Sequence, residues 1–240
     1  MVDPQDPANR GAAGAAAAVA HHEGLAAGWT GRYLRGGFRR RAEFFVHEIL
    51  PQLPAGGRWL DVGCGSGVFS RMLVARGCEV LGVDASPAMI EAANAEPAPG
   101  LAFRCATIDS LAEENMRFGG ALCLSVIEYA PSPREALEII ARLVEPGGWF
   151  ALSAPNALAP VRAAQSLARA LARPFGRRPF GYLDVSRHAF RRAELVALLN
   201  ACGFEVVNVG GFDPVLGGGA LPSLHFVVCR KVGAAPSEKG

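Results

Sequence analysis

The sequence predicts an α/β fold in which a doubly wound, mostly parallel sheet carries helices on both faces. From Trp59 onward, short apolar runs typical of strands alternate with amphipathic helical patterns, which indicates βαβ units. Several of these runs are apolar without interruption, as expected of strands that are covered on both faces. The length of 240 residues, of which 50% are hydrophobic, suffices for one such domain with a sizeable core.

The expected strands are short runs bounded by turn residues. They lie at Arg58–Val62, Glu79–Val83, Leu101–Cys105, Ala121–Val126, Trp149–Ser153, Phe204–Val209 and Leu224–Cys229.

Helix signals lie between these strands. Ser132-Pro133-Arg134-Glu135 is a capping box with proline at the first helical position, and Glu145-Pro146-Gly147-Gly148 ends the helix that it begins. Ser86-Pro87 begins another helix in the same way. A later apolar stripe at helical spacing ends at Gly203.

The rest of the chain divides around this domain. We expect a flexible tail over 1–20, a helical cover over 21–50, the α/β domain over 51–231 and a flexible tail over 232–240. Residues 155–190 form an insertion far longer than an ordinary loop, which favours a functional lid. The lid is amphipathic and basic, with arginines at helical spacing on one face: Arg162, Arg169 and Arg173, followed by Arg177 and Arg178.

Composition excludes several classes of protein. The 24 basic and 22 acidic side chains give a net charge of +2, so no nucleic-acid partner is expected. The six cysteines form no CxxC pair, which argues against a metal site or a disulfide framework and favours a reducing cytoplasm. The first residues are acidic and proline-rich, so we expect no secretory leader, and no run is long and apolar enough to span a membrane.

The sharpest local signal is the glycine turn, Gly63-Cys64-Gly65-Ser66-Gly67, which follows a strand directly. Glycine allows positive φ and lets ligand atoms approach the backbone closely. The dinucleotide fingerprint would need glycine where Val68 or Ser70 stands, and no Walker lysine follows. Asp84 ends the next strand, so its carboxylate is expected beside the turn, where it can accept both hydroxyls of a ribose. Asp61 and Asp84 would repel phosphates, which favours a ribose-bearing ligand with a positive or zwitterionic head group.

These motifs, together with Leu124–Tyr129, Leu143–Gly148 and Ala201–Val206, resemble a class I S-adenosylmethionine-dependent methyltransferase of the small-molecule type. The resemblance covers roughly residues 45 to 230 and implies a seven-stranded sheet of order 3-2-1-4-5-7-6 with the last strand antiparallel. It implies S-adenosyl-L-methionine as cofactor, with Asp84 on the ribose. The candidate cofactor-binding residues are Asp61, Gly63, Cys64, Gly65, Gly67, Asp84, Ala85, Thr107, Ile108 and Ser125.

The sequence departs from this family at two positions. Relatives usually carry an acid where Thr107 stands, so Thr107, the backbone near Ile108 or Asp109 would contact the adenine. Many relatives have a histidine where Tyr129 stands, and this tyrosine is either a packing residue or a base.

Methyl transfer to oxygen needs an aligned acceptor and, in some cases, a base for its proton. The candidate catalytic residues are His188, Tyr129 and Glu128, with His188 either a base or a residue that holds the lid. Tyr33 is a candidate aromatic cover. A second basic cluster precedes the sheet: Arg32, Arg35, Arg39, Arg40 and Arg41. This cluster and the lid arginines are either solvated or frame an entrance for an anionic acceptor.

We therefore expect transfer of a methyl group to a small-molecule acceptor that is hydrophobic, anionic or both, with oxygen as the acceptor atom. The basic lid is also compatible with peripheral contact to a membrane surface or a lipid. No obligate protein partner is evident. The alternatives are an enzyme that methylates RNA or protein, and a non-catalytic regulatory module that binds S-adenosylmethionine.

Overall fold

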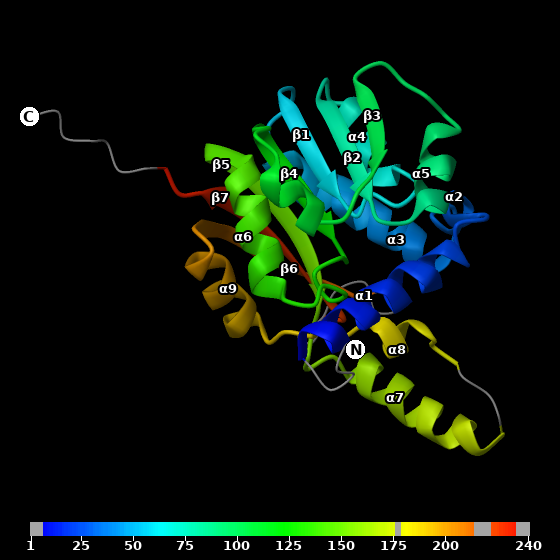
Figure 1. Ribbon diagram of the computed structural model, residues 1–240. Helices are drawn as coiled ribbons and strands as arrows, with labels where there is room; N and C mark the ends of the chain where they lie inside the picture. The colour runs from blue at the N-terminus through cyan, green and yellow to red at the C-terminus, as the bar shows by residue number, and fades with distance from the viewer. Residues whose placement is uncertain (1–6, 176–178, 214–221, 234–240) are drawn as a thin grey trace, which may run out of the picture.

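A seven-stranded sheet of order β3-β2-β1-β4-β5-β7-β6 forms the centre of the molecule (Figure 1). The computed structural model describes residues 7–175, 179–213 and 222–233. The strands are β1 (Arg58–Val62), β2 (Glu79–Asp84), β3 (Leu101–Cys105), β4 (Phe118–Leu124), β5 (Val144–Pro155), β6 (Phe204–Phe212) and β7 (Leu224–Lys231). β1 to β5 pair in parallel, and β7 is antiparallel to both β5 and β6, which confirms the predicted fold class and strand order.

Helices cover both faces of the sheet. The longer ones are α1 (Pro7–Glu23), α3 (Gly36–Phe44), α4 (Val68–Val74), α5 (Pro87–Asn94), α6 (Pro133–Leu143), α7 (Pro160–Ala172) and α9 (Arg192–Ala201). The shorter ones are α2 (Trp29–Arg32), η1 (Phe45–Ile49), η2 (Leu50–Gln52), η3 (Asp109–Glu113), η4 (Arg173–Phe175) and α8 (Tyr182–Val185).

Side chains alternate between the two faces of each strand, so the sheet separates two apolar cores. Leu60 and Val62 of β1 pack into the core that contains the apolar faces of α6 and α9, whereas Trp59 packs into the core that contains η1 and α4. The caps predicted for two helices are confirmed. Ser86 accepts a hydrogen bond from the Met89 amide, and Ser132 accepts one from the Glu135 amide.

Five of the seven strands differ from their predicted bounds: β2, β6 and β7 extend further at their carboxyl ends, and β4 and β5 differ most. β4 ends at Leu124 because Ser125 adopts a left-handed φ of 58°, which a strand does not accommodate. The helix α6 ends at Leu143 as expected, but β5 begins at once and includes the predicted turn. The pairing of β4 with β5 is irregular there, since the register shifts between Phe118 and Gly120.

The prediction of a flexible tail over 1–20 is wrong from Pro7, where α1 begins. Alanine is the strongest helix former, and its small side chain allows close packing. Ala18 is buried, and α1 contacts α5 and α8. In Figure 1, α1 runs along the edge of the sheet at which β1 and β2 end, and α7 projects away from the body of the molecule. The predicted lid thus contains α7, η4 and α8, although Arg177 and Arg178 lie outside the described residues.

None of the helices in the described part of the chain has both the length and the apolar character needed to span a membrane.

Candidate active site

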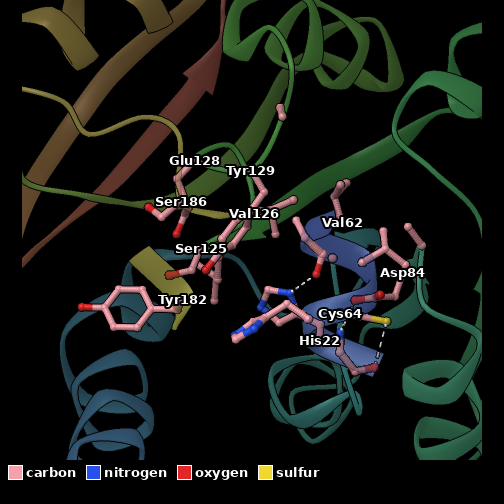
Figure 2. Close-up of a pocket in the computed structure, with 18 of the residues that line it drawn as sticks. His22, Val62, Cys64, Asp84, Ser125, Val126, Glu128, Tyr129, Tyr182 and Ser186 are labelled. Atoms are coloured by element: carbon pink, nitrogen blue, oxygen red, sulfur yellow. Dashed lines mark hydrogen bonds between the residues drawn. The ribbon is translucent and has the colours of Figure 1, made fainter. Parts of the chain in front are cut away.

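A cavity of about 870 Å³ lies at the carboxyl edge of the sheet. The ends of β1, β2 and β4 line one side of it, and residues of α1, α2, α3, α7 and α8 line the other. Small-molecule sites typically measure about 300–1,000 Å³, so this cavity is near the upper limit. Figure 2 shows Val62, Cys64 and Asp84 on one side and Ser125, Glu128, Tyr129 and Ser186 on the other. We call these the glycine-turn end and the Glu128 end.

The glycine turn has the backbone conformation that its sequence predicts. Gly63, Gly65 and Gly67 have φ values of 68°, 54° and 79°. The amides of Gly63 and Cys64 both donate to the Val83 carbonyl, at 2.7 and 3.0 Å, which fastens the turn to β2. A Cβ on Gly63 would lie 2.2 Å from a methyl group of Val126, so only glycine fits there. Gly63, Cys64 and Gly65 line the cavity, whereas Gly67 packs against Phe103 and Arg71 outside it.

Asp84 stands beside the turn, as predicted. Its Oδ2 accepts a hydrogen bond from the Gly65 amide and its Oδ1 one from the Ser86 amide, both at 2.9 Å. These bonds fix the carboxylate, and the remaining lone pairs are available to a ligand because Asp84 and Ala85 line the cavity.

Asp61 is buried at the same end of the cavity. Its Oδ2 accepts a hydrogen bond of 2.5 Å from the Ser70 hydroxyl. Burial raises the pKa of Asp61 to about 7; the Ser70 hydrogen bond opposes this rise, and the nearby negative charge of Asp84 adds to it. A cationic group in the cavity would stabilise the ionised form of Asp61. Burial likewise raises the pKa of the Cys64 thiol well above its usual value, so this cysteine is a poor nucleophile.

The segment that follows β3, up to the first residue of η3, contributes Thr107, Ile108 and Asp109 to the cavity wall. The Thr107 hydroxyl accepts a hydrogen bond from the Ser110 amide at 3.2 Å, and the Ser110 hydroxyl donates to the Thr107 carbonyl at 2.8 Å. The Ile108 carbonyl likewise accepts a hydrogen bond from the Leu111 amide at 3.0 Å, so the Thr107 hydroxyl proton and the Asp109 carboxylate are the groups left for a ligand at this wall.

Glu128 dominates the other end. It is 2% exposed, and burial raises its pKa to about 7, although the charges of Arg41 and Arg162 and a hydrogen bond from Ser125 oppose the rise. Its neighbour Tyr129 also lines the cavity, and burial, then the charge of Glu128, raises its pKa far above the usual value. The Tyr129 phenol is therefore protonated at neutral pH.

His188 lies apart from these residues. Its Nε2 is 3.1 Å from the Ala130 carbonyl oxygen, its ring stacks on Phe190, and its backbone amide donates to the Glu128 carbonyl. His188 does not line the cavity formed by the described residues, so its contacts agree with the alternative in which it holds the lid.

The lid arginines differ from one another in position. Arg162 lines the cavity and donates to the Ser186 hydroxyl at 3.1 Å. Arg169 forms an ion pair with Asp184. Arg173 is exposed and, like Arg169, is not part of the described cavity wall.

The predicted aromatic cover lines the cavity, but only part of the second basic cluster does. Tyr33 lines the cavity and packs against Phe38 and Phe69. Within the basic cluster, Arg32 and Arg41 line the cavity, whereas the others are exposed: Arg35, Arg39 and Arg40.

Sequence reasoning assigned no site role to His21 and His22, yet both line the cavity. The ring of His22 lies 5.0 Å from that of Tyr129 and 5.8 Å from that of Trp29. No motif marks them, because their position depends on α1 folding back over the sheet edge.

Comparison with known proteins agrees with this geometry. The family described as "Methyltransferase domain" matches residues 33–209. Ubiquinone biosynthesis O-methyltransferase from Alkalilimnicola ehrlichii is 39% identical over 116 residues, 47% of either chain. The protein of that name from Xanthomonas axonopodis pv. citri is 32% identical over 168 residues, 66% of either chain. The chain thus spans about half to two thirds of the length of these relatives.

Solved structures share the fold. Magnesium protoporphyrin IX methyltransferase from Synechocystis PCC 6803, solved with bound SAH (S-adenosylhomocysteine), superposes with a TM-score of 0.60 over 81% of this chain and 84% of that one, at 17% identity. The family match covers well over half of the sequence. The resemblance to class I S-adenosylmethionine-dependent methyltransferases is therefore confirmed, and the chain belongs to the methyltransferase domain family.

Proposed function

We propose that the protein is an S-adenosylmethionine-dependent methyltransferase that methylates a hydroxyl oxygen of a small molecule. The observation that carries the proposal is one cavity with two chemically distinct ends, a glycine turn flanked by carboxylates and a buried carboxyl group opposite. Relatives named as O-methyltransferases support the acceptor atom. The structural neighbour solved with bound SAH supports the cofactor.

The residues at the glycine-turn end fit this cofactor. When bound, S-adenosylmethionine supplies a methyl group that is already activated by its sulfonium sulfur. Gly63 and Gly65 leave the backbone bare, the Asp84 carboxylate suits the two ribose hydroxyls, and Asp61 suits a positive group of the methionine portion. Thr107, Ile108 and Asp109 line the part of the wall that would contact the adenine, where the Thr107 hydroxyl proton and the Asp109 carboxylate are unengaged.

At the Glu128 end, we assign the proton acceptor to Glu128 in preference to His188 or Tyr129. Glu128 has a pKa of about 7, which suits a base at neutral pH, and it lines the cavity. Tyr129 is protonated, and the Nε2 of His188 faces the Ala130 carbonyl. Arg162 adds a positive charge near Glu128, which favours an acceptor with acidic character.

The surface of α7 supports the predicted peripheral contact with a lipid surface. Leu167 and Leu171 are 62% and 65% exposed, and Arg173 lies close to them in the sequence. Apolar and basic side chains together favour the interface of an anionic bilayer. Co-sedimentation with vesicles containing anionic lipid, for wild type and a Leu167→Ser, Leu171→Ser variant, tests this contact, and equal binding by the two would exclude it. The cytoplasmic location stays a prediction.

Calorimetry with S-adenosylhomocysteine tests the cofactor assignment. We expect binding by the wild type and at least about tenfold weaker binding by Asp84→Ala, because the ribose hydroxyls lose their acceptor. Equal affinities would remove the ribose assignment. Transfer of labelled methyl from S-adenosylmethionine to phenolic acceptors then separates an enzyme from a regulatory binding module, and insensitivity of that transfer to added salt argues against an RNA substrate.

A further inference from the structure

Two residues that line the cavity each carry a buried polar atom without a hydrogen-bond partner among the described residues. These atoms are the Nε of Arg41, which is a donor, and the Oε2 of Glu128, which is an acceptor. Folded proteins pair nearly all buried polar groups, so an unpaired donor and an unpaired acceptor in the same cavity point to a ligand group that both accepts and donates. A hydroxyl group has this property.

Arg41 is held firmly in place. Its Nη2 donates to the Ser153 hydroxyl at 3.2 Å, and its guanidinium carbon lies 5.5 Å from the ring centre of Phe69 and 5.9 Å from that of Phe226. The Ser153 hydroxyl is 3.3 Å from that of Ser125, and Ser125 in turn forms a hydrogen bond with Glu128. The two unpaired atoms thus belong to one network anchored on β5 and the end of β4.

Arg41 and Glu128 interact electrostatically but do not form a direct ion pair. No ion pair joins them within 4.0 Å in the described part of the chain, yet the charge of Arg41 opposes the rise in the pKa values of Glu128, Tyr129 and Tyr33. All four residues line the same cavity. A hydroxyl oxygen that bridges the two side chains would make a hydrogen bond of about 2.7–3.0 Å to each.

We propose that Arg41 and Glu128 hold the reacting hydroxyl of the acceptor between them, a role that rests on the proposed O-methylation. The hydroxyl donates to Oε2 of Glu128 and accepts from Nε of Arg41. When its O–H bond breaks, the proton passes to the Glu128 carboxylate and the electron pair stays on the oxygen beside the guanidinium. The carboxylate becomes neutral as the oxygen becomes negative, so the net charge of the three groups is unchanged.

This arrangement discriminates between kinds of hydroxyl. A phenol has a pKa of about 10, and an adjacent cation lowers such a value by about 1–3. Burial and the charge of Glu128 oppose that effect and raise the pKa of the nearby Tyr129 phenol, so only a phenol that is already acidic in water comes close to the pKa of about 7 of Glu128, whose neighbours also include Arg162 and Cys123. An aliphatic hydroxyl resembles water, whose pKa is much higher than that of a phenol, and stays far out of range. The pair therefore favours acidic hydroxyls.

The test uses 4-nitrocatechol, whose ionised form absorbs visible light, bound to protein saturated with S-adenosylhomocysteine. We expect the wild type to lower the apparent pKa of the bound probe relative to the free probe. Arg41→Gln should raise it by about 1 or more, a tenfold change in ionisation, because the oxygen loses its cationic partner. Glu128→Gln should reduce the first ionisation of the bound probe to one simple step, where the wild type shows two coupled steps shared between the probe and Glu128. Arg40→Gln is the matched control, since Arg40 is exposed and outside the cavity, and it should behave as wild type.

Calorimetry with S-adenosylhomocysteine on each variant keeps the two proposals separate. If the wild type does not bind S-adenosylhomocysteine, the proposed function is contradicted. Retained binding, with the same probe pKa in wild type and Arg41→Gln, would overturn the role of Arg41. Failure of the loaded wild type to bind the probe would also overturn it. If Arg41→Gln does not melt cooperatively, the probe titrations of the wild type and of Glu128→Gln test the proposal instead. The proposal is refuted if the wild type does not lower the pKa of the bound probe below that of the free probe. It is also refuted if Glu128→Gln shows the same two coupled ionisations as the wild type.

Discussion

Replacement of Gly65 by alanine adds one methyl group to the part of the backbone that we assign to the cofactor. Gly65 has a φ of 54°, and its new Cβ would lie 3.1 Å from Nε1 of Trp29. Gly77 provides a matched control, because its φ of 79° is also left-handed and no described atom lies within 4 Å of the position that a Cβ would take there. Gly77 lies outside the wall of the described cavity.

Both substitutions place a side chain in left-handed backbone, but only Gly65→Ala also obstructs the cavity. A side chain in the left-handed region costs about 1–2 kcal/mol, so both variants should lose about that much stability. Only Gly65→Ala also pushes Trp29 away and occupies the space next to the bare backbone. A loss of about 1.4 kcal/mol in ligand binding corresponds to a tenfold weaker dissociation constant. We therefore expect at least that loss for Gly65→Ala and none for Gly77→Ala.

Denaturant unfolding measures the shared cost, and calorimetry with S-adenosylhomocysteine measures the difference. The comparison is direct because each variant adds the same methyl group in a similar backbone conformation. If Gly65→Ala binds S-adenosylhomocysteine as tightly as Gly77→Ala does, the close approach of the ligand to the turn is wrong.

Three other changes separate the roles assigned to single residues. At saturating S-adenosylmethionine, where the cationic ligand holds Asp61 ionised, Glu128→Gln should abolish the rise with pH near 7 in kcat/KM for the acceptor, whereas His188→Ala should keep it. The reverse result in pH–rate profiles would restore His188 as the base. Asp61→Asn should raise the Tm relative to wild type, and by more at pH 8 than at pH 5, because the raised pKa of Asp61 makes its ionisation unfavourable in the folded state. Thermal melts that give the same difference in Tm at the two pH values would contradict this. Arg162→Gln should raise KM for an acidic acceptor more than Arg169→Gln, since Arg169 is paired with Asp184; steady-state kinetics that rank them the other way would contradict the geometry.

The fold was predictable because local signals and long-range packing agree in this sequence. Ser86 and Ser132 each cap a helix where their motifs predict it, and the uninterrupted apolar runs became the buried strands. The disagreement at α1 has a physical reason. A run of alanines has no apolar stripe of large side chains, so the pattern resembles a tail, whereas helix propensity and close packing on α8 favour a helix.

The glycine-turn end of the site was also predictable, because adjacent parallel strands bring Asp84 to Gly65 by register alone. At the Glu128 end, the sequence pointed to Glu128, Tyr129, Ser125 and Arg162, which all line the cavity, but not to Arg41. Arg41 belongs to a run of arginines that is uniform in sequence, and only the packing of α3 against β5 and β7 distinguishes it from Arg40. The feature that identifies Arg41 is its unpaired buried Nε, which depends on the folded structure and leaves no mark in the sequence.

The two buried carboxyl groups at opposite ends of the cavity impose a common pH dependence. Asp61 and Glu128 each have a pKa raised to about 7, chiefly by burial. A carboxyl group whose pKa is raised by folding contributes stability at low pH that is lost as the pH rises through the folded-state value. Both groups must nevertheless be ionised to act, Asp61 to bind a cation and Glu128 to accept a proton. The unliganded protein therefore loses this stability between the ordinary pKa values of 3.8 and 4.5 and the folded-state values of about 7, and activity should rise at the upper end of that pH range. A bound cationic cofactor should offset the loss at Asp61, so the stabilisation by S-adenosylmethionine should increase with pH between 6 and 8. The neutral sulfur of S-adenosylhomocysteine removes one of the two positive charges and should give a smaller increase. Thermal melts with the two ligands at matched saturation measure this difference, and identical pH dependences would show that the sulfonium charge does not interact with Asp61.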